Sequence, residues 1–243
     1  MSSTLGSLTL DSIADEVAER GYARRSPAEV RATLRGSDAE LRDFAGSWQR
    51  LETDGFMRDG GRYRLRRLAN FLAIPGEAGH RRGLHRAHFQ ATVHNTLNGG
   101  VDRWFAPVED AAVANPFCQG LLALGRDVAD RLHPATRWFV EMHQFRVQAQ
   151  PNSPGHPTPE GVHHDGVDVV LIAMLARTNL KGGETRVTDD DGRELARFTL
   201  EGMLDLTILD DRRVMHGVTP VQPANNALPS SRDVLVLTWK RAA

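Results

Sequence analysis

Cysteine is almost absent from this chain, and so are long apolar runs. Cys118 is the single cysteine among 243 residues, so no intrachain disulfide can form and no cluster of thiolates can hold a metal. No segment approaches the roughly twenty consecutive apolar residues that a membrane helix needs. The first ten residues lack the basic start and apolar core of a secretion signal. We therefore expect a soluble, cytoplasmic protein with no membrane partner.

Charge of one sign is also lacking. The formal net charge is −1 at pH 7, so no overall electrostatic attraction to nucleic acid or to an anionic membrane is expected. Lys181 and Lys240 are the only lysines among 30 basic residues, and we attribute this excess of arginine to the codon usage of a GC-rich genome. The hydrophobic fraction of 40% and charged fraction of 25% are those of an ordinary globular protein.

Capping patterns predict helices in the N-terminal part. Residues 11–20 are amphipathic and are followed by a glycine. The sequences at 26–29 (Ser-Pro-Ala-Glu) and 37–40 (Ser-Asp-Ala-Glu) are consecutive capping boxes, and the second opens a helix that we expect to continue towards residue 50. Residues 62–74 look extended. A further helix is expected over 116–132, where apolar residues fall on one face.

From residue 136 onward, short β-branched segments separated by turn residues predict strands. The expected strands are 137–148, 168–176, 184–187, 194–199, 203–209, 213–218 and 233–240. Such strands without intervening helices favour a sandwich, a jelly roll or a barrel. We expect one domain, residues 1–243, in which a helical and irregular part, 1–135, supports a β core, 136–243.

The motif that carries chemistry is His-x-Asp at positions 163–165. In an extended segment, residues i and i+2 project to the same side, so His163 and Asp165 can bind one ion together. A third ligand must come from elsewhere, and His216, between two strand-like segments, is the natural candidate. Two histidines and one carboxylate on one face of an octahedron leave three positions open, as in non-haem Fe(II) oxygenases.

Spacing alone leaves this assignment open. With ten histidines and many aspartates, an H-x-D match arises readily by chance. His164, at the middle position, should point away from the ion and either support a ligand or simply pack. The histidines lack the helical spacing of zinc proteases, which disfavours that class.

If the oxygenase uses 2-oxoglutarate, a cation must bind the distal carboxylate. Arginine suits this role because it is permanently charged and binds a carboxylate through two parallel hydrogen bonds. Arg232 begins the final expected strand, and antiparallel pairing can return it to the site of His216. The alternatives are a surface ion pair for Arg232 and another arginine as the cation: Arg146, Arg186, Arg212 or Arg213.

Several stretches of the chain resemble one family, the bacterial 2-oxoglutarate/Fe(II) dioxygenases typified by L-isoleucine dioxygenase, with biofilm-associated homologues. They occur in the order of that family and cover about residues 140–240. The stretches are 143–146 (His-Gln-Phe-Arg), 159–166 (Pro-Glu-Gly-Val-His-His-Asp-Gly), 182–185 (Gly-Gly-Glu-Thr), 216–220 (His-Gly-Val-Thr-Pro) and 232–238 (Arg-Asp-Val-Leu-Val-Leu-Thr). The segment 95–105, with Gly-Gly-x-x-Arg, is similar but less specific.

The resemblance implies an α+β protein that is mainly β, with a double-stranded β-helix core (jelly roll, cupin-like) and N-terminal helices. It implies Fe(II) bound by His163, Asp165 and His216, Arg232 on 2-oxoglutarate, and dioxygen as the second co-substrate. The implied reaction is hydroxylation or thioether oxidation of a free L-amino acid or similar small molecule, with 2-oxoglutarate decarboxylated to succinate. Arg146 is a candidate for the substrate carboxylate, although a structural ion pair fits it equally well.

Three other functions remain compatible with the pattern. A peptide or protein hydroxylase would need an open groove, whereas a free amino acid needs a small closed pocket with paired charges. A non-enzymatic jelly-roll protein that binds a metal or ligand would turn over no 2-oxoglutarate. Cupin-type isomerisation on the same barrel would need no co-substrate.

The loop 151–161 leads directly into the histidines. It is rich in proline and glycine and has almost no apolar anchors, which is typical of a weakly packed segment. We expect it to border the pocket and to act as a mobile lid that becomes ordered when ligands bind.

Overall fold

The computed structural model describes residues 10–242, and a large antiparallel sheet forms its centre. The strand order is β1-β10-β6-β13-β5-β3-β2, and β4 pairs with β3 beside this path. The strands are β1 (Tyr22–Arg25), β2 (Glu52–Thr53), β3 (Arg64–Ala73), β4 (Arg81–Arg82), β5 (Trp138–Ala149), β6 (Val169–Thr178), β10 (Leu206–Asp210) and β13 (Ser230–Arg241).

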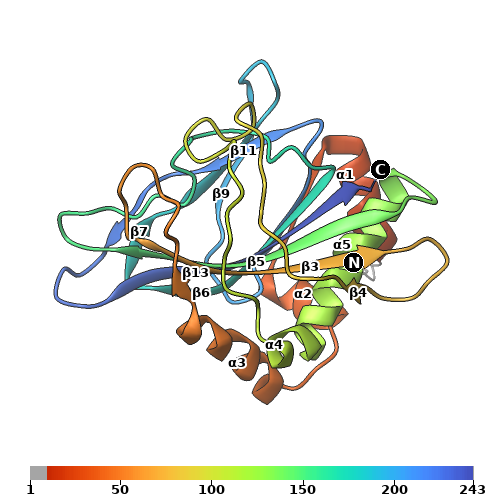
Figure 1. Cartoon of the computed structure of the whole chain (residues 1–243), viewed down its shortest axis with the longest axis horizontal. Coiled ribbons are helices and arrows are strands. Elements are labelled where there is room, and N and C mark those ends of the chain that lie inside the picture. The colour runs from red at the N-terminus through yellow and green to blue at the C-terminus, as the bar shows by residue number, and fades with distance from the viewer. Residues whose placement is uncertain (1–9, 243) are drawn as a thin grey trace, which may run out of the picture.

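A smaller β layer faces the large sheet. It consists of a three-stranded sheet, β11-β8-β9, and a pair, β12-β7. Figure 1 shows β9 and β11 on one side of the long strands and the helices on the other. The strands are β7 (Leu180–Gly182), β8 (Glu184–Thr188), β9 (Glu194–Thr199), β11 (Met215–Val218) and β12 (Val221–Pro223). This arrangement confirms the expected mainly β fold with N-terminal helices.

β6 shows why the central strands have apolar side chains on both faces. Leu171 and Leu175 belong to the core that the sheet shares with the helices. Val170, Ile172 and Met174 belong to the second core, on the side of the smaller layer. A strand covered on both faces has no solvated side, so its sequence is a continuous apolar run instead of an alternating one.

Helices cover the other face of the large sheet (Figure 1). Both predicted capping boxes are present, with Ser26 accepting the Glu29 N–H and Ser37 accepting the Glu40 N–H. The helix expected to reach residue 50 instead becomes a 3-10 turn after residue 46. The elements are α1 (Leu10–Arg20), α2 (Pro27–Thr33), α3 (Asp38–Gly46), η1 (Ser47–Arg50), α4 (Asp110–Ala114) and α5 (Pro116–Leu132).

The helix α5 packs closely on the sheet because one of its residues has no side chain. A Cβ on Gly125 would lie 2.0 Å from the Trp239 ring, so only glycine allows this contact. Trp239 on β13 is fully buried as a result. The contact fixes the helical layer against the strand that also carries Arg232.

The N-terminal part contributes more than support. β1 pairs with β10, and β3 pairs with β5 along ten residue positions, from Arg64 opposite Val147 to Ala73 opposite Trp138. Residues before 136 therefore complete the large sheet itself. No helix within residues 10–242 is both long and apolar enough to cross a membrane. The expectation that the first ten residues are not a secretion signal falls almost entirely on residues 1–9. These residues lie outside the described range.

Candidate metal and co-substrate site

One cavity brings together most of the residues expected to carry chemistry. It has a volume of about 120 Å³ and is walled by strands of the large sheet on one side and by the segment before β6 and β11 on the other. A cavity of this size has room for on the order of ten water molecules, which is enough for small ligands. His163, Asp165, His216 and Arg232 all line it.

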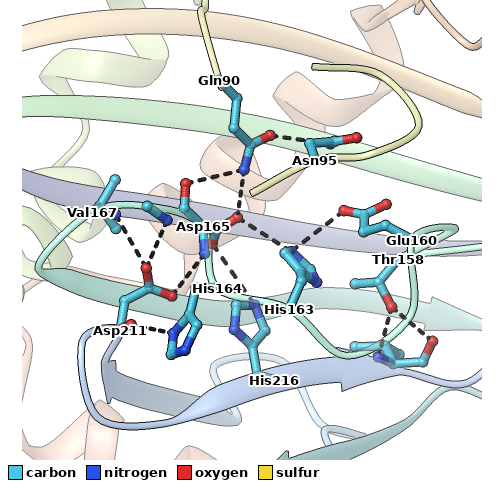
Figure 2. Close-up of polar contacts among 12 residues, drawn as sticks. Gln90, Asn95, Thr158, Glu160, His163, His164, Asp165, Val167, Asp211 and His216 are labelled. Atoms are coloured by element: carbon cyan, nitrogen blue, oxygen red, sulfur yellow. Dashed lines mark hydrogen bonds and ion pairs between the residues drawn. The ribbon is translucent and has the colours of Figure 1, made fainter. Parts of the chain in front are cut away.

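The three predicted metal ligands converge. His163 and His216 form an antiparallel bridge, in which each backbone N–H donates to the other residue's carbonyl oxygen at 3.0 Å. His163 Nε2 lies 3.4 Å from Asp165 Oδ1, and His216 Nε2 lies 3.8 Å from Asp165 Oδ2. Figure 2 shows the three side chains pointing toward one another. The predicted convergence of these side chains is therefore confirmed.

Hydrogen bonding prepares His163 to bind a cation. Its Nδ1 donates to the Gly161 carbonyl oxygen at 3.0 Å, so in the neutral ring the lone pair is on Nε2, facing the other two ligands. Burial lowers the pKa of His163, but the hydrogen bond and charge of Asp165 outweigh it and raise the pKa to about 9. Burial lowers the pKa of His216 to about 4. A cation that binds here therefore displaces a proton from His163.

The turn after Asp165 is fixed by Asp211, a residue that the sequence motifs did not indicate. The Asp211 carboxylate accepts the backbone N–H groups of Gly166 at 2.8 Å and Val167 at 3.1 Å. Gly166 has a φ of 80°, and a Cβ there would lie 2.4 Å from the His94 ring. Only glycine fits this position, because it adopts positive φ without strain and fills no space.

The side chains of His164 and of the predicted site residue Arg146 face away from the cavity. His164 points away from the three ligands, as expected, and its Nε2 lies 2.9 Å from Asp190 Oδ1. Arg146 forms two hydrogen bonds to Asp233, at 2.7 and 2.6 Å, and does not line the cavity, whereas its neighbour Phe145 does. Successive side chains of a strand alternate between faces. The expectation that Arg146 binds the substrate carboxylate is therefore wrong, and the alternative ion pair is what the structure contains.

Arg232 lines the same cavity as the three predicted metal ligands. It stands on β13 opposite Val147, lines the cavity and is 3% exposed. Within residues 10–242 it has no carboxylate partner, and its Nε has no hydrogen-bond partner. Burial, with a contribution from Arg177, lowers the pKa of Arg232 to about 10. A buried cation without a counter-charge is costly, so a bound anion would stabilise this side chain.

A second group of two histidines and a carboxylate lines the same cavity. His88, Glu141 and His143 lie close enough together to hold a metal ion. His88 Nδ1 lies 2.8 Å from Glu141 Oε2, while His143 Nδ1 lies 2.7 Å from Arg66 Nη2 and accepts its hydrogen bond. The Arg66 guanidinium already occupies one ring nitrogen of His143, and its positive charge would repel a metal ion. This group is therefore a poorer metal site than the His163 group.

The sequence motifs did not indicate the side of the cavity that contains this second group, because residues 75–107 looked irregular. Its components come from β3, from β5 and from the irregular segment itself. One signal was available: Arg64 and Arg66 sit at alternate positions of a predicted extended segment, so both face the same side. Both side chains are buried and contact Asp54, at 2.7 and 3.7 Å.

The loop 151–161 borders the cavity, as predicted, through Thr158 and Glu160 among others. It is better anchored than its sequence suggested. Gly155 forms a backbone bridge with Val221 through hydrogen bonds of 3.0 and 2.9 Å, and the Thr158 hydroxyl accepts the Val218 N–H at 2.9 Å. The expectation of weak packing is therefore wrong, because backbone pairing anchors this loop in place of apolar side chains. Its ordering by ligands stays a prediction.

Comparison with known proteins decides the family. The model of the 2OG-Fe dioxygenase family matches residues 45–238. The chain belongs to the 2OG-Fe dioxygenase family. This membership agrees with the resemblance seen in the sequence motifs, and Fe(II), 2-oxoglutarate and dioxygen are the metal and co-substrates of this family.

Two relatives of this 2OG-Fe dioxygenase chain act on isoleucine or its derivative. It is 28% identical over 157 residues to the 3(1)-hydroxy-L-isoleucine 4-dioxygenase of Pantoea ananatis, covering 63% of each chain. It is 25% identical over 156 residues to the L-isoleucine-4-hydroxylase of Bacillus thuringiensis, covering 63% of this chain and 64% of that enzyme. The alignment thus spans somewhat less than two thirds of either relative.

Solved structures agree over the whole chain. A bsmA homologue from Methylobium petroleophilum is 36% identical, with a TM-score of 0.86, and the match covers 97% of this chain and 94% of that one. IDO from Bacillus thuringiensis is 17% identical, with a TM-score of 0.82 and full coverage of both chains. These structures confirm the jelly-roll fold of the 2OG-Fe dioxygenase chain.

Proposed function

We propose that this chain is a Fe(II)/2-oxoglutarate-dependent dioxygenase that oxidises a free L-amino acid or a similarly small molecule. One observation carries the proposal. The three converging ligands, His163, Asp165 and His216, and the buried, uncompensated Arg232 line one cavity of about 120 Å³. A metal-binding face and an anion-binding group in one small cavity are what a chelating keto diacid requires.

His163, Asp165 and His216 would hold the metal. Two imidazoles and one carboxylate are the donor set of non-haem Fe(II) oxygenases. His163 Nε2 and His216 Nε2 lie 3.4 and 3.8 Å from the two Asp165 oxygens, and one ligand atom of each residue lies within 4.8 Å of the others, so one ion could be shared by all three. Bound Fe(II) would supply the chemistry that couples dioxygen to the decarboxylation of 2-oxoglutarate and the oxidation of the substrate.

Arg232 would bind the distal carboxylate of 2-oxoglutarate. Its planar fork can donate two parallel hydrogen bonds, which fixes the orientation of the diacid as well as its charge. Val218 and Val234 line the cavity with it. Apolar walls exclude water and strengthen the interaction between the guanidinium and the carboxylate.

The size of the cavity and the relatives support a free amino acid as the substrate. Room for on the order of ten water molecules accommodates 2-oxoglutarate and one small molecule. The two curated relatives are named for reactions on L-isoleucine and a hydroxylated L-isoleucine. The single, buried Cys118 suits the reducing cytoplasm, which we propose as the site of action.

The decisive experiment is succinate release. Protein loaded with Fe(II) without oxygen is mixed with 2-oxoglutarate, exposed to air and screened against the twenty common L-amino acids, beginning with L-isoleucine. We expect one or a few of them to raise succinate release and to yield a product heavier by one oxygen atom. His216→Ala should release no succinate. A wild-type protein that binds no 2-oxoglutarate in the presence of Fe(II) would overturn the proposal.

A further inference from the structure

The ion pairs of the buried arginines divide them into two groups. Six arginines among residues 10–242 are buried: Arg25, Arg64, Arg66, Arg103, Arg126 and Arg232. Four of them form ion pairs with Glu16, Asp54 or Asp130: Arg25, Arg64, Arg66 and Arg126. In the same described range, Arg103 and Arg232 have no carboxylate within ion-pair distance. Both line the one cavity that contains the metal ligands.

Arg103 is deeply buried. It is 2% exposed, and its Nε has no hydrogen-bond partner. Within the described residues, its one side-chain hydrogen bond is a long one, from Nη2 to the Gln90 amide oxygen at 3.4 Å. Glu141, which also lines the cavity, is already in contact with His88 at 2.8 Å and His143 at 3.5 Å. Asp54, Glu160 and Glu141 act on the Arg103 charge only from beyond ion-pair distance. Burial of a guanidinium without a directly bound carboxylate is costly, and the expected compensation is an anionic ligand.

The backbone holds Arg103 rigidly at this wall. Arg103 and His88 form an antiparallel bridge, with N–H to carbonyl distances of 2.9 and 3.0 Å. Gln90, which accepts from Arg103, donates to the Asp165 carbonyl oxygen at 3.1 Å and accepts from the Asn95 amide at 3.1 Å (Figure 2). Arg103 is therefore coupled to the segment that carries the metal ligand Asp165.

Arg232 belongs to a different wall. Its Cδ lies 3.9 Å from where a Cβ of Gly183 would be, and Arg177 is the charged neighbour that affects its pKa. Arg103 instead pairs with His88 through the backbone and donates a hydrogen bond to Gln90. Two separate buried cations in one cavity, each without a carboxylate at ion-pair distance, indicate two separate anionic groups. One is the distal carboxylate of 2-oxoglutarate, and the second is unassigned.

We propose that Arg103 binds a carboxylate of the primary substrate, so that the enzyme requires a small molecule with a free carboxylate. This inference rests on the proposed function and narrows it, because an amide, an ester or an internal peptide residue offers no such group. Arg103 takes the role that the sequence suggested for Arg146. The charge-assisted, bidentate contact both binds the substrate and orients it beside the metal ligands.

The test compares a free acid with its amide. Protein loaded with Mn(II) and N-oxalylglycine, an inert analogue of 2-oxoglutarate, is titrated by calorimetry with the twenty common L-amino acids. The tightest-binding acid is then compared with its carboxamide, which differs only at the carboxylate. We expect the wild type to bind the acid at least about a hundredfold more tightly, as a charge-assisted pair of roughly 3 kcal/mol implies.

Arg103→Gln should remove this preference by weakening the acid to the level of the amide, and Arg103→Lys should restore part of it. Arg86→Gln, an exposed arginine of the same segment, is the matched control and should bind as the wild type does. Without substrate, Arg103→Gln should melt no lower than the wild type, because it removes a buried charge that has no partner. A structural arginine would destabilise the fold when replaced.

The measurements distinguish failure of the proposed function from failure of the inference about Arg103. If 2-oxoglutarate does not bind to the Mn(II)-loaded wild type, the proposed function fails. If 2-oxoglutarate binds but no acid binds, if the acid and amide bind equally, or if Arg103→Gln keeps the preference, only the inference about Arg103 is overturned. Loss of 2-oxoglutarate binding in Arg103→Gln, with the acid unaffected, would overturn it too, by exchanging the roles of Arg103 and Arg232.

Discussion

The carboxylate of Asp211 holds the backbone of Asp165, because Asp211 Oδ1 accepts the Asp165 N–H at 2.9 Å. The other carboxylate oxygen accepts the two N–H groups that follow, at Gly166 and Val167. Asp211 lies just after β10, so one side chain at the end of this strand orients the turn that carries Asp165, a proposed metal ligand. Groups that orient metal ligands in this way commonly affect metal affinity almost as strongly as the ligands do.

We expect Asp211→Asn to weaken metal binding by about 10- to 100-fold with little loss of the fold. The substituted amide nitrogen is a donor, so it cannot accept the backbone N–H groups that a carboxylate oxygen accepts. Anaerobic titration with Fe(II) measures the effect. Asp191→Asn, at an exposed turn position, should bind as the wild type does. Equal affinities for both variants would refute this role of Asp211.

Only one of the two histidine–carboxylate groups should bind iron. His216→Ala removes a neutral imidazole from the cavity and should abolish tight Fe(II) binding, since two ligands remain. His88→Gln, in the second group, should leave the stoichiometry of one ion per chain unchanged. Spectroscopic titration with Co(II) or Fe(II) measures the affinity and the number of bound ions for both variants. Tight binding that survives in His216→Ala but is lost in His88→Gln would reverse the assignment.

Arg232→Lys should raise the dissociation constant for 2-oxoglutarate at least about tenfold, which corresponds to roughly 1.4 kcal/mol. Lysine keeps the charge but loses the bidentate geometry and reaches less far into the cavity. Calorimetry on the Mn(II)-loaded protein gives the constant directly. Arg137→Lys, at an exposed position before β5, serves as the control. An unchanged constant for Arg232→Lys would move the co-substrate to another arginine.

His80 should make folding stability depend on pH. Burial, with the nearby Arg126, lowers the pKa of His80 to about 4 from an ordinary 6.5, and its Nε2 accepts the Trp239 indole N–H at 3.4 Å. Because the folded-state pKa is below the unfolded value, stability is complete above about pH 6.5. It falls as pH decreases toward 4, by on the order of 2 kcal/mol after allowance for partial exposure.

His80→Gln keeps an acceptor for Trp239 but cannot take up a proton. Its free energy of unfolding, measured by urea denaturation between pH 7.5 and 5, should therefore change less than that of the wild type. His85→Gln, an exposed histidine of the neighbouring segment, should leave the pH dependence unchanged. If His80→Gln and the wild type lose stability in parallel, the protonation of His80 is not involved.

Local signals in the sequence predicted most of the elements and indicated the proposed metal ligands. The helix at 116–132 and the capping boxes at Ser26 and Ser37 depend on contacts within one turn, so the sequence alone predicts them. The His-x-Asp pair follows from the two-residue period of extended backbone. His216 is distant from this pair in sequence. It could be proposed as the third ligand because the family motifs include it.

Only the tertiary structure decided which charged residues face the cavity. Arg146 and Arg232 both lie on long strands and were both candidates for binding a carboxylate, but strand alternation and the pairing of β5 with β13 turn Arg146 towards Asp233 and Arg232 inwards. Arg103 lies in a segment without a periodic pattern, so nothing local predicts its burial. Whether a charge is compensated depends on residues distant in sequence, and this is why only the fold shows that Arg103 and Arg232 are buried without an ion pair among the described residues.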